Sequence, residues 1–201
     1  MILGIETSAS LCSLCLWDQN KAITYADADI GVGHASVLFE LLERIEKENG
    51  LSLKNVTHVA IARGPGSFTG IRVGLSFATG LALAGNLPIL GLTCFEIALH
   101  KLSLTHTFGV AFDTKRQDFY GAFYQNDQCL EMGIWTKETL LQKQKSLNAS
   151  LWTDVPQLFE EATPLRLTAQ DVAHAAAVYQ KITPNIFSQD PFYLRPPKVY
   201  E

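Results

Sequence analysis

LGIETSASLCSLCLWDQNKAITYAD, residues 3–27, is the stretch that decides the fold class. Three segments in it, 3–6, 11–17 and 22–27, are apolar or alternate between apolar and polar side chains, and short polar turns separate them. Alternation with a period of two is typical of strands that bury one face, and turns this short join antiparallel neighbours. The stretch therefore predicts a meander of three antiparallel strands.

The pattern after the meander continues as helix, strand, helix and strand. A helix over 35–48 is indicated by apolar residues on one stripe at helical spacing, and Asn49 with Gly50 would close it. The next three segments, a strand, a helix and a strand, are expected at 56–62, 70–85 and 87–92. Meander, helix, strand, helix, strand is the order of a ribonuclease-H-like lobe.

The second half of the chain repeats the opening of the first. A strand is expected at 108–113, followed by alternating segments at 118–124 and 129–135. Glu6 ends the first strand of one half and Asp113 ends the corresponding strand of the other, so the two carboxylates would face a shared cleft. Such a duplication predicts an α/β fold of the actin-like (ASKHA) class with two lobes.

The division into lobes is expected near residue 104. The first lobe would be the ribonuclease-H-like part, 1–104, and the second a shorter C-terminal lobe, 105–201. Within the second lobe, Thr168 is expected to cap a helix that runs through Lys181, and a proline-rich tail returns at the end.

Composition excludes several classes of protein. The 201 residues are 47% hydrophobic and carry a formal net charge of −4, whereas a domain that binds nucleic acid by itself usually presents a basic stripe. The longest apolar run, 73–85, is shorter than the roughly 20 residues of a membrane-spanning helix, and the first residues lack the pattern of a signal peptide. We therefore expect a cytoplasmic protein without a membrane span.

Residues 62–75, ARGPGSFTGIRVGL, form the most unusual segment, between an expected strand and an expected helix. Free N–H groups at a helix N-terminus favour an anion, so Ser67 and Thr69 are candidate phosphate contacts. The alternative is a glycine turn in which one of these hydroxyls caps the helix. The spacing differs from that of a Walker A loop, and the segment contains no lysine.

The helix that follows carries a row of small residues at intervals of four. Because the rest of its circumference is largely apolar, this helix must be buried nearly all round. The row would let a helix of another subunit approach closely. The alternative is a central helix that is covered entirely by its own chain. The row consists of Gly70, Gly74, Ala78 and Ala82.

Several segments together resemble the TsaB (YeaZ) proteins of bacteria. They are the signature 64–70 with the helix start that follows it, the opening 3–8, the strand 88–92, the Phe112-Asp113 turn, and the terminal stretch 193–197. This resemblance covers most of the chain. It implies the actin-like fold and the non-catalytic dimerisation subunit of a complex that transfers a threonylcarbamoyl group to N6 of the adenosine next to the anticodon in tRNA.

The resemblance also implies the partners: a TsaD-type catalytic subunit, which this chain would bind and activate, and a TsaE-type ATPase. The chain would meet tRNA only through the complex, and a homodimer of the isolated chain stays open. The catalytic relative holds a metal with a His-x-x-x-His motif, where this chain has Cys94 and Ala98. Alanine cannot coordinate a metal, so we expect no catalytic residues, metal or cofactor here, with ATP and metal on the partner subunits.

Two sets of site residues are thus expected. The alternative function is an independent nucleotide-binding hydrolase or kinase of the actin-like class, in which Glu6 and Asp113 would organise magnesium and water. The partner interface would lie on helices 35–48 and 70–85, at Phe39, Gly70, Arg72, Gly74, Ala78 and Ala82. The candidate phosphate or nucleotide contacts are Glu6, Thr7, Ser8, Ser67, Thr69 and Asp113.

Overall fold

The computed structural model of the chain describes residues 1–9, 11–29, 34–49, 53–182, 188 and 190–195. It consists of two compact units. Unit 1 comprises Met1–His100 and Leu167–Phe192, and unit 2 comprises Lys101–Arg166 and Tyr193–Glu201. Gly50, expected to help close the first helix, and Pro196 and Pro197 of the terminal stretch lie outside the described residues.

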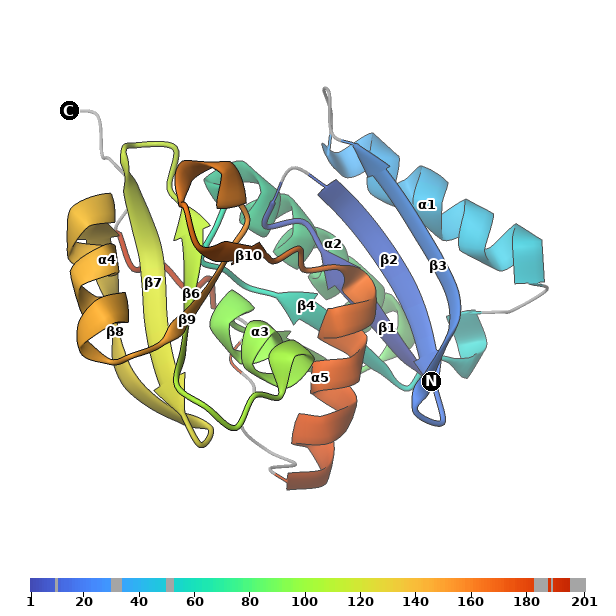
Figure 1. The fold of residues 1–201 in the computed structure, drawn as a ribbon. Helices are drawn as coiled ribbons and strands as arrows, with labels where there is room; N and C mark the ends of the chain where they lie inside the picture. The colour runs from blue at the N-terminus through green and yellow to red at the C-terminus, as the bar shows by residue number, and fades with distance from the viewer. Residues whose placement is uncertain (10, 30–33, 50–52, 183–187, 189, 196–201) are drawn as a thin grey trace. The chain divides into compact units, whose positions relative to one another are not determined.

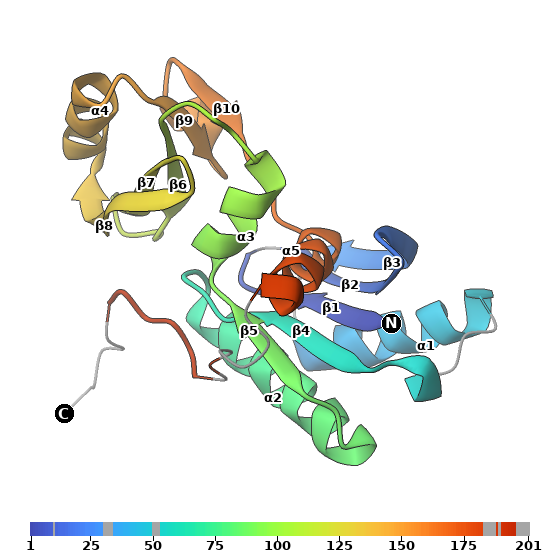
Figure 2. The same cartoon turned by 90° about the horizontal axis from the view of Figure 1, so that it is seen from below.

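Unit 1 is built on a five-stranded mixed sheet with the order β3-β2-β1-β4-β5 (Figures 1 and 2). The first three strands form the predicted antiparallel meander, and β4 and β5 continue the sheet in parallel with β1. The central strand is buried along its whole length. The strands are β1 Ile2–Glu6, β2 Leu11–Asp18, β3 Lys21–Asp29, β4 His58–Ala62 and β5 Ile89–Leu92.

Helices cover both faces of this sheet. The first two helices lie side by side on one face, and α5 crosses the other face over β1, β2 and β4 (Figure 2). Close approach of α5 requires Gly4, because a Cβ at that position would lie 2.2 Å from the carbonyl oxygen of Ala169. The helices of this unit are α1 His34–Asn49, the 3₁₀ turn Leu53–Asn55, α2 Phe68–Gly85, α3 Cys94–Leu102, which continues into unit 2, and α5 Ala169–Ile182.

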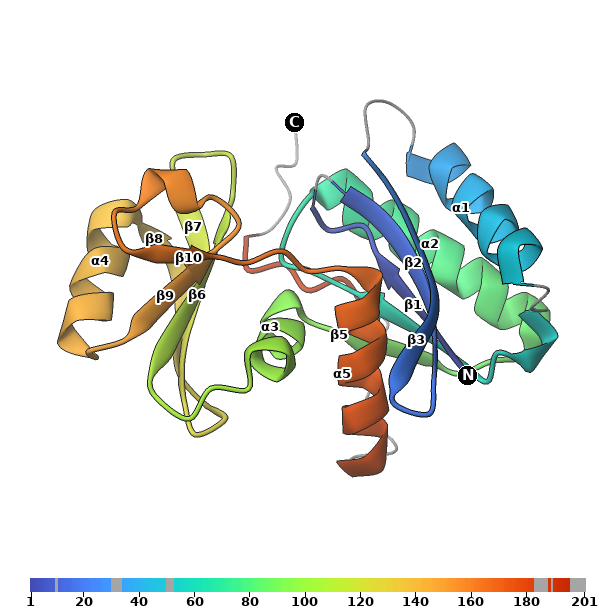
Figure 3. The same cartoon turned by 45° about the vertical axis from the view of Figure 1, so that its right-hand side comes forward.

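Unit 2 contains a second five-stranded sheet with the order β10-β9-β6-β7-β8 (Figure 3). Its antiparallel β6, β7 and β8 repeat the meander of unit 1, as predicted. Helix α4 packs on β7 and β8, and Phe119, Phe123 and Leu140 lie in the core between them. The elements are β6 Phe108–Asp113, β7 Asp118–Gln125, β8 Gln128–Thr136, α4 Lys137–Ser146, β9 Ser150–Thr153, the 3₁₀ turn Pro156–Leu158 and β10 Ala162–Pro164.

The division of the chain differs from the expected boundary between 104 and 105. Helix α5 was expected within a second lobe, 105–201, but it returns to unit 1. The physical reason is that β1 is apolar on both sides, so the sheet needs a cover on each face. Helix α5 provides that cover, and its fully buried small side chains are Ala169, Val172, Ala173, Ala175 and Ala176.

Helix α2 is long and apolar enough to cross a membrane by length and composition alone. In unit 1 its buried side instead packs on β4, β1 and β5. Its opposite side exposes the polar Arg72, Ser76 and Thr79. The helix therefore has the burial pattern of a core helix with one accessible side.

Candidate partner-binding helices and the network that anchors them

The small-residue row of α2 faces the interior of unit 1. A Cβ on Gly70 would lie 2.0 Å from the carbonyl oxygen of Thr7, and one on Gly74 would lie 2.1 Å from the Thr7 hydroxyl. Ala78 is fully buried, and Ala82 is 6% exposed. The close approach made possible by Gly70 and Gly74 is therefore to Thr7, just after β1 of the same chain. Because Ala78 and Ala82 are buried as well, the expectation that these four residues meet a partner helix is corrected.

The accessible side of α2 lies opposite that row. Leu83 is 78% exposed and Phe68 is 39% exposed, although both are large and apolar. On the neighbouring helix α1, Phe39 is 59% exposed and its ring lies edge-on to Phe77 of α2 with 5.2 Å between centroids. We call the exposed surface formed by these two helices the outer face; its residues are Phe39, Phe68, Arg72, Ser76, Gly80 and Leu83.

Arg72 of α2 and Lys47 of α1 each have a partner within their own helix. The guanidinium of Arg72 lies over the Phe68 ring, 4.0 Å from its centroid, and Lys47 pairs with Glu43 at 2.9 Å. Of the expected interface residues, Phe39 and Arg72 are thus exposed on the outer face. Leu83 was missed as a site residue, because a helix that is apolar nearly all round gives no sign in its sequence of which side faces solvent.

The first turn of α2 is anchored to the turn that follows β1. The Thr7 hydroxyl donates to the carbonyl oxygen of Gly70 at 2.9 Å, and the Ser67 N–H donates to the carbonyl oxygen of Ser8 at 2.7 Å. Ser67 also caps the helix, because its hydroxyl accepts from the Gly70 N–H at 3.2 Å. The carbonyl oxygen of Ser67 accepts from the Ile71 N–H at 2.9 Å. The start of α2 is therefore tied to β1 by side-chain and backbone hydrogen bonds.

Glu6 supports this anchor from inside the protein. Its Oε1 accepts from both the N–H and the hydroxyl of Ser8, each at 2.5 Å, whereas its Oε2 is buried without a partner. Burial raises the pKa of Glu6 to about 7, against the lowering effect of the Ser8 hydrogen bonds. The negative charge of Asp171 on α5 adds to the raised pKa. Glu6 is a fully buried carboxyl that orients Ser8, and Ser8 in turn holds Ser67.

These contacts bear on the expected phosphate site. Glu6 and Thr7 are fully buried and Ser8 is 7% exposed, and all three are engaged inside unit 1. The structure thus brings them together with Ser67, but as a structural network rather than as groups that are open to a ligand. Thr69 is exposed and lies apart from the network on the outer side of the first turn. The capped-turn alternative describes this segment.

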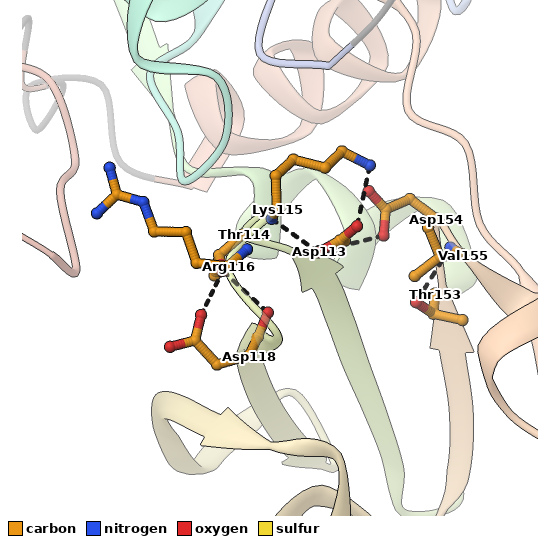
Figure 4. A network of polar contacts seen from close by, with 8 residues as sticks. All are labelled: Asp113, Thr114, Lys115, Arg116, Asp118, Thr153, Asp154 and Val155. Atoms are coloured by element: carbon orange, nitrogen blue, oxygen red, sulfur yellow. Dashed lines mark hydrogen bonds and ion pairs between the residues drawn. The ribbon is translucent and has the colours of Figure 1, made fainter.

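The other expected carboxylate, Asp113, lies in unit 2 within its own polar network (Figure 4). Its Oδ1 accepts from the Lys115 N–H at 2.7 Å, and its Oδ2 pairs with the Lys115 ammonium at 3.0 Å. The N–H of Asp113 donates to Asp154 at 3.0 Å, and burial raises the pKa of Asp154. In the same hairpin Thr114 contacts Asp118, which pairs with Arg195. The carboxylate of Asp113 is therefore paired with the ammonium group of Lys115.

The position of the relative's metal ligands does not fit a metal in this chain. Cys94 and Ala98 are both buried at the start of α3, and the Cys94 sulfur lies 3.2 Å from the Ser8 hydroxyl. Between them, Glu96 caps its own helix by accepting from the N–H and hydroxyl of Thr93 at 2.6 and 2.8 Å. Among the described residues, no cluster of three or more histidine, cysteine, aspartate or glutamate side chains could hold a metal ion.

Comparison with known proteins assigns the family. A family model described as "TsaD: tRNA N6-adenosine threonylcarbamoyltransferase" matches residues 30–144, more than half of the chain. The chain belongs to this family, in its TsaB (YeaZ) branch. The matched region contains both helices of the outer face.

Proteins of the TsaB branch resemble the chain along most of its length. The Escherichia coli K12 protein named "tRNA threonylcarbamoyladenosine biosynthesis protein TsaB" is 34% identical over 141 residues, which are 68% of this chain and 59% of that protein. The Haemophilus influenzae protein of the same name is 26% identical over 96% of this chain and 93% of its own length. The structure titled "YeaZ from Pseudomonas aeruginosa" has a TM-score of 0.75 at 21% identity, covers 96% of this chain and 98% of its own, and confirms the fold.

Proposed function

We propose that this chain is the non-catalytic dimerisation subunit of a threonylcarbamoyl-transferring complex that acts on tRNA in the cytoplasm. In this role it binds a TsaD-type catalytic subunit through the outer face and activates it. The observation that carries the proposal is the exposure of Leu83 and Phe39 on adjacent helices of unit 1. Large apolar side chains that gather on a surface mark interaction sites more often than isolated ones do.

The choice of partner rests on family relationship. The matching family model is named for the transferase, and it covers α1 and α2 of this chain. A homologous catalytic subunit would therefore carry helices of the same kind, and two related subunits can pair through like surfaces around an approximate two-fold axis. Leu83 and Phe39 would supply the apolar centre of that interface, with Arg72 and Ser76 at its polar rim.

The assignment of a non-catalytic role rests on three features of unit 1. Ala98 stands where a metal ligand would be needed, and Cys94 is packed against Ser8. Glu6, the carboxylate that an actin-like hydrolase or kinase would use, is fully buried and binds Ser8. These features favour the accessory subunit over an independent nucleotide hydrolase or kinase.

The remaining partners follow from this role. A TsaE-type ATPase would join the pair, and ATP and metal would be held by the partner subunits. Because the chain has a formal net charge of −4, we expect it to meet tRNA only as part of the complex. Transfer would require all subunits together.

The test is association with the purified TsaD-type subunit, measured by sedimentation velocity. Leu83→Glu places a charge at the centre of the outer face, so complex formation should be lost while the melting temperature of the isolated variant stays near that of the parent. Leu158→Glu is the matched control, because Leu158 is an exposed leucine of unit 2, at 43%.

The control should bind the partner like the parent protein. Equal binding by the Leu83 and Leu158 variants would remove the outer face from the interface. A parent protein that forms no complex with the TsaD-type subunit would overturn the proposed function itself.

A further inference from the structure

A short C-terminal segment of unit 1, of which Ser188 and 190–192 are described, lies against Arg63, which follows β4, and against Gly91 of β5. The Phe192 N–H donates to the carbonyl oxygen of Arg63 at 2.7 Å. In return, the Arg63 guanidinium donates to the carbonyl oxygen of Asp190 at 3.3 Å and lies 5.5 Å from the centre of the Phe192 ring. Arg63 therefore holds the segment by its backbone and by its aromatic side chain.

Two glycines make room for this contact. A Cβ on Gly91 of β5 would lie 2.0 Å from the carbonyl oxygen of Ser188, and one on Gly64 would lie 2.7 Å from that of Phe192. Gly64 also has a φ of +106°, a conformation that favours glycine. The surface around Arg63, Gly64 and Gly91 is thus shaped to the backbone of the segment; we call it the seat.

The seat is continuous with the anchor of α2. Gly64 is followed within three residues by Ser67, which caps α2 and whose N–H bonds to Ser8. The carbonyl oxygen of Gly64 accepts from the Cys94 N–H at 2.7 Å. The loop before α2 is therefore held on one side by the turn after β1 and on another by the C-terminal segment.

The described residues of the segment are accessible to solvent. Ser188 and Asp190 are exposed and Phe192 is half-buried. They contact the seat through the Phe192 N–H, through the Asp190 carbonyl oxygen and the Phe192 ring on the Arg63 side chain, and through the backbone beside Gly91 and Gly64. A contact of this size can open locally without unfolding of the sheet beneath it.

We propose that Ser188 and residues 190–192 form a strap that sets the conformation of the loop 64–67, and through it the first turn of the partner-binding helix α2. With the strap in its seat, the outer face is preorganised for the partner. With the strap released, the loop gains freedom, and the partner must order it again at a cost in affinity. This inference deepens the proposed function and rests on it.

The strap can be released from either side by a small substitution. Gly91→Ala brings a methyl group against the Ser188 backbone and leaves an ordinary strand residue in β5. Phe192→Ala removes the ring that the Arg63 guanidinium covers. Leu158→Ala is the control for the isolated protein, because Leu158 is an exposed leucine of unit 2 and belongs neither to the seat nor to the outer face.

Hydrogen–deuterium exchange of the isolated full-length variants is the first measurement. In both strap variants, exchange should rise in peptides that cover 188–195 and also in those that cover 64–71, whereas the control should match the parent. Unchanged exchange in 64–71 after release of the strap would overturn the proposal. This measurement needs no partner, so its failure is distinct from a failure of the proposed function.

Affinity for the TsaD-type subunit is the second measurement. Each strap variant should bind at least about fivefold more weakly, in the range of typical coupling between two sites. Because both variants break the same contact, the double variant should be no weaker than the weaker single one. Parent-like affinity in both variants, with Leu83→Glu still inactive in binding, would overturn the strap and leave the proposed interface in place.

Discussion

Replacement of the buried carboxyl in Glu6→Gln should remove a pH dependence from the stability of the protein. Burial raises the pKa of Glu6 to about 7 from its ordinary value of 4.5, so the folded state holds a proton that the unfolded state releases between these two pH values. Stability therefore falls as pH rises through this window. From pH 5 to pH 8 the loss for one such group is roughly 2–3 kcal/mol.

The side chain of glutamine can keep the Ser8 hydrogen bonds through its Oε1 while it carries no charge at any pH. Its amide NH₂ takes the place of the Oε2 that has no partner, which costs roughly 1–3 kcal/mol at all pH values. The difference between parent and variant, measured by urea unfolding at pH 5, 6, 7 and 8, isolates the titration of Glu6. We expect this difference to change by roughly 2–3 kcal/mol in favour of the variant across the series. If the free energies of unfolding of parent and variant ran parallel from pH 5 to pH 8, the assigned titration of Glu6 would be wrong.

Three further outcomes follow from the structure. Ala78→Arg, at a fully buried position of α2, should lower the free energy of unfolding by roughly 3 kcal/mol or more, and a parent-like thermal melt would contradict the placement of the small-residue row in the core. Gly80→Ala, on the exposed side of the same helix, should raise the free energy of unfolding by about 0.5–1 kcal/mol in urea unfolding. No gain would count against the free space that surrounds a Cβ at this position. The isolated chain should hydrolyse no ATP above a buffer control, since Ala98 supplies no ligand; metal-dependent turnover by the pure protein would refute this.

Much of the fold could be predicted because its signals are local. The alternation in 11–17 and 22–27 and the turns beside these segments gave the meander, and the stripe in 35–48 gave α1. The return of α5 to unit 1 could not be predicted in this way. Its alanine-rich side suits either sheet, and the choice depends on which sheet face lacks a cover.

The sites were harder to predict than the elements. The small residues of α2 permit a close neighbour, but only the position of Thr7 shows that this neighbour is β1 of the same chain. Glu6 reads as an open carboxylate at a strand end, whereas packing of α5 buries it. Contacts between segments far apart in sequence, such as that between Arg63 and Phe192, leave no periodic pattern.

Reconstitution of the modification tests the central claim most directly. The purified chain, a TsaD-type subunit, a TsaE-type ATPase, ATP, threonylcarbamoyl adenylate and unmodified tRNA are combined, with each protein omitted in turn, and the threonylcarbamoyladenosine content of the tRNA is measured by mass spectrometry of its nucleosides. We expect modification with the full set, none with this chain alone, and a loss when this chain is omitted or carries Leu83→Glu. Modification by this chain alone, or undiminished modification without it, would contradict the account.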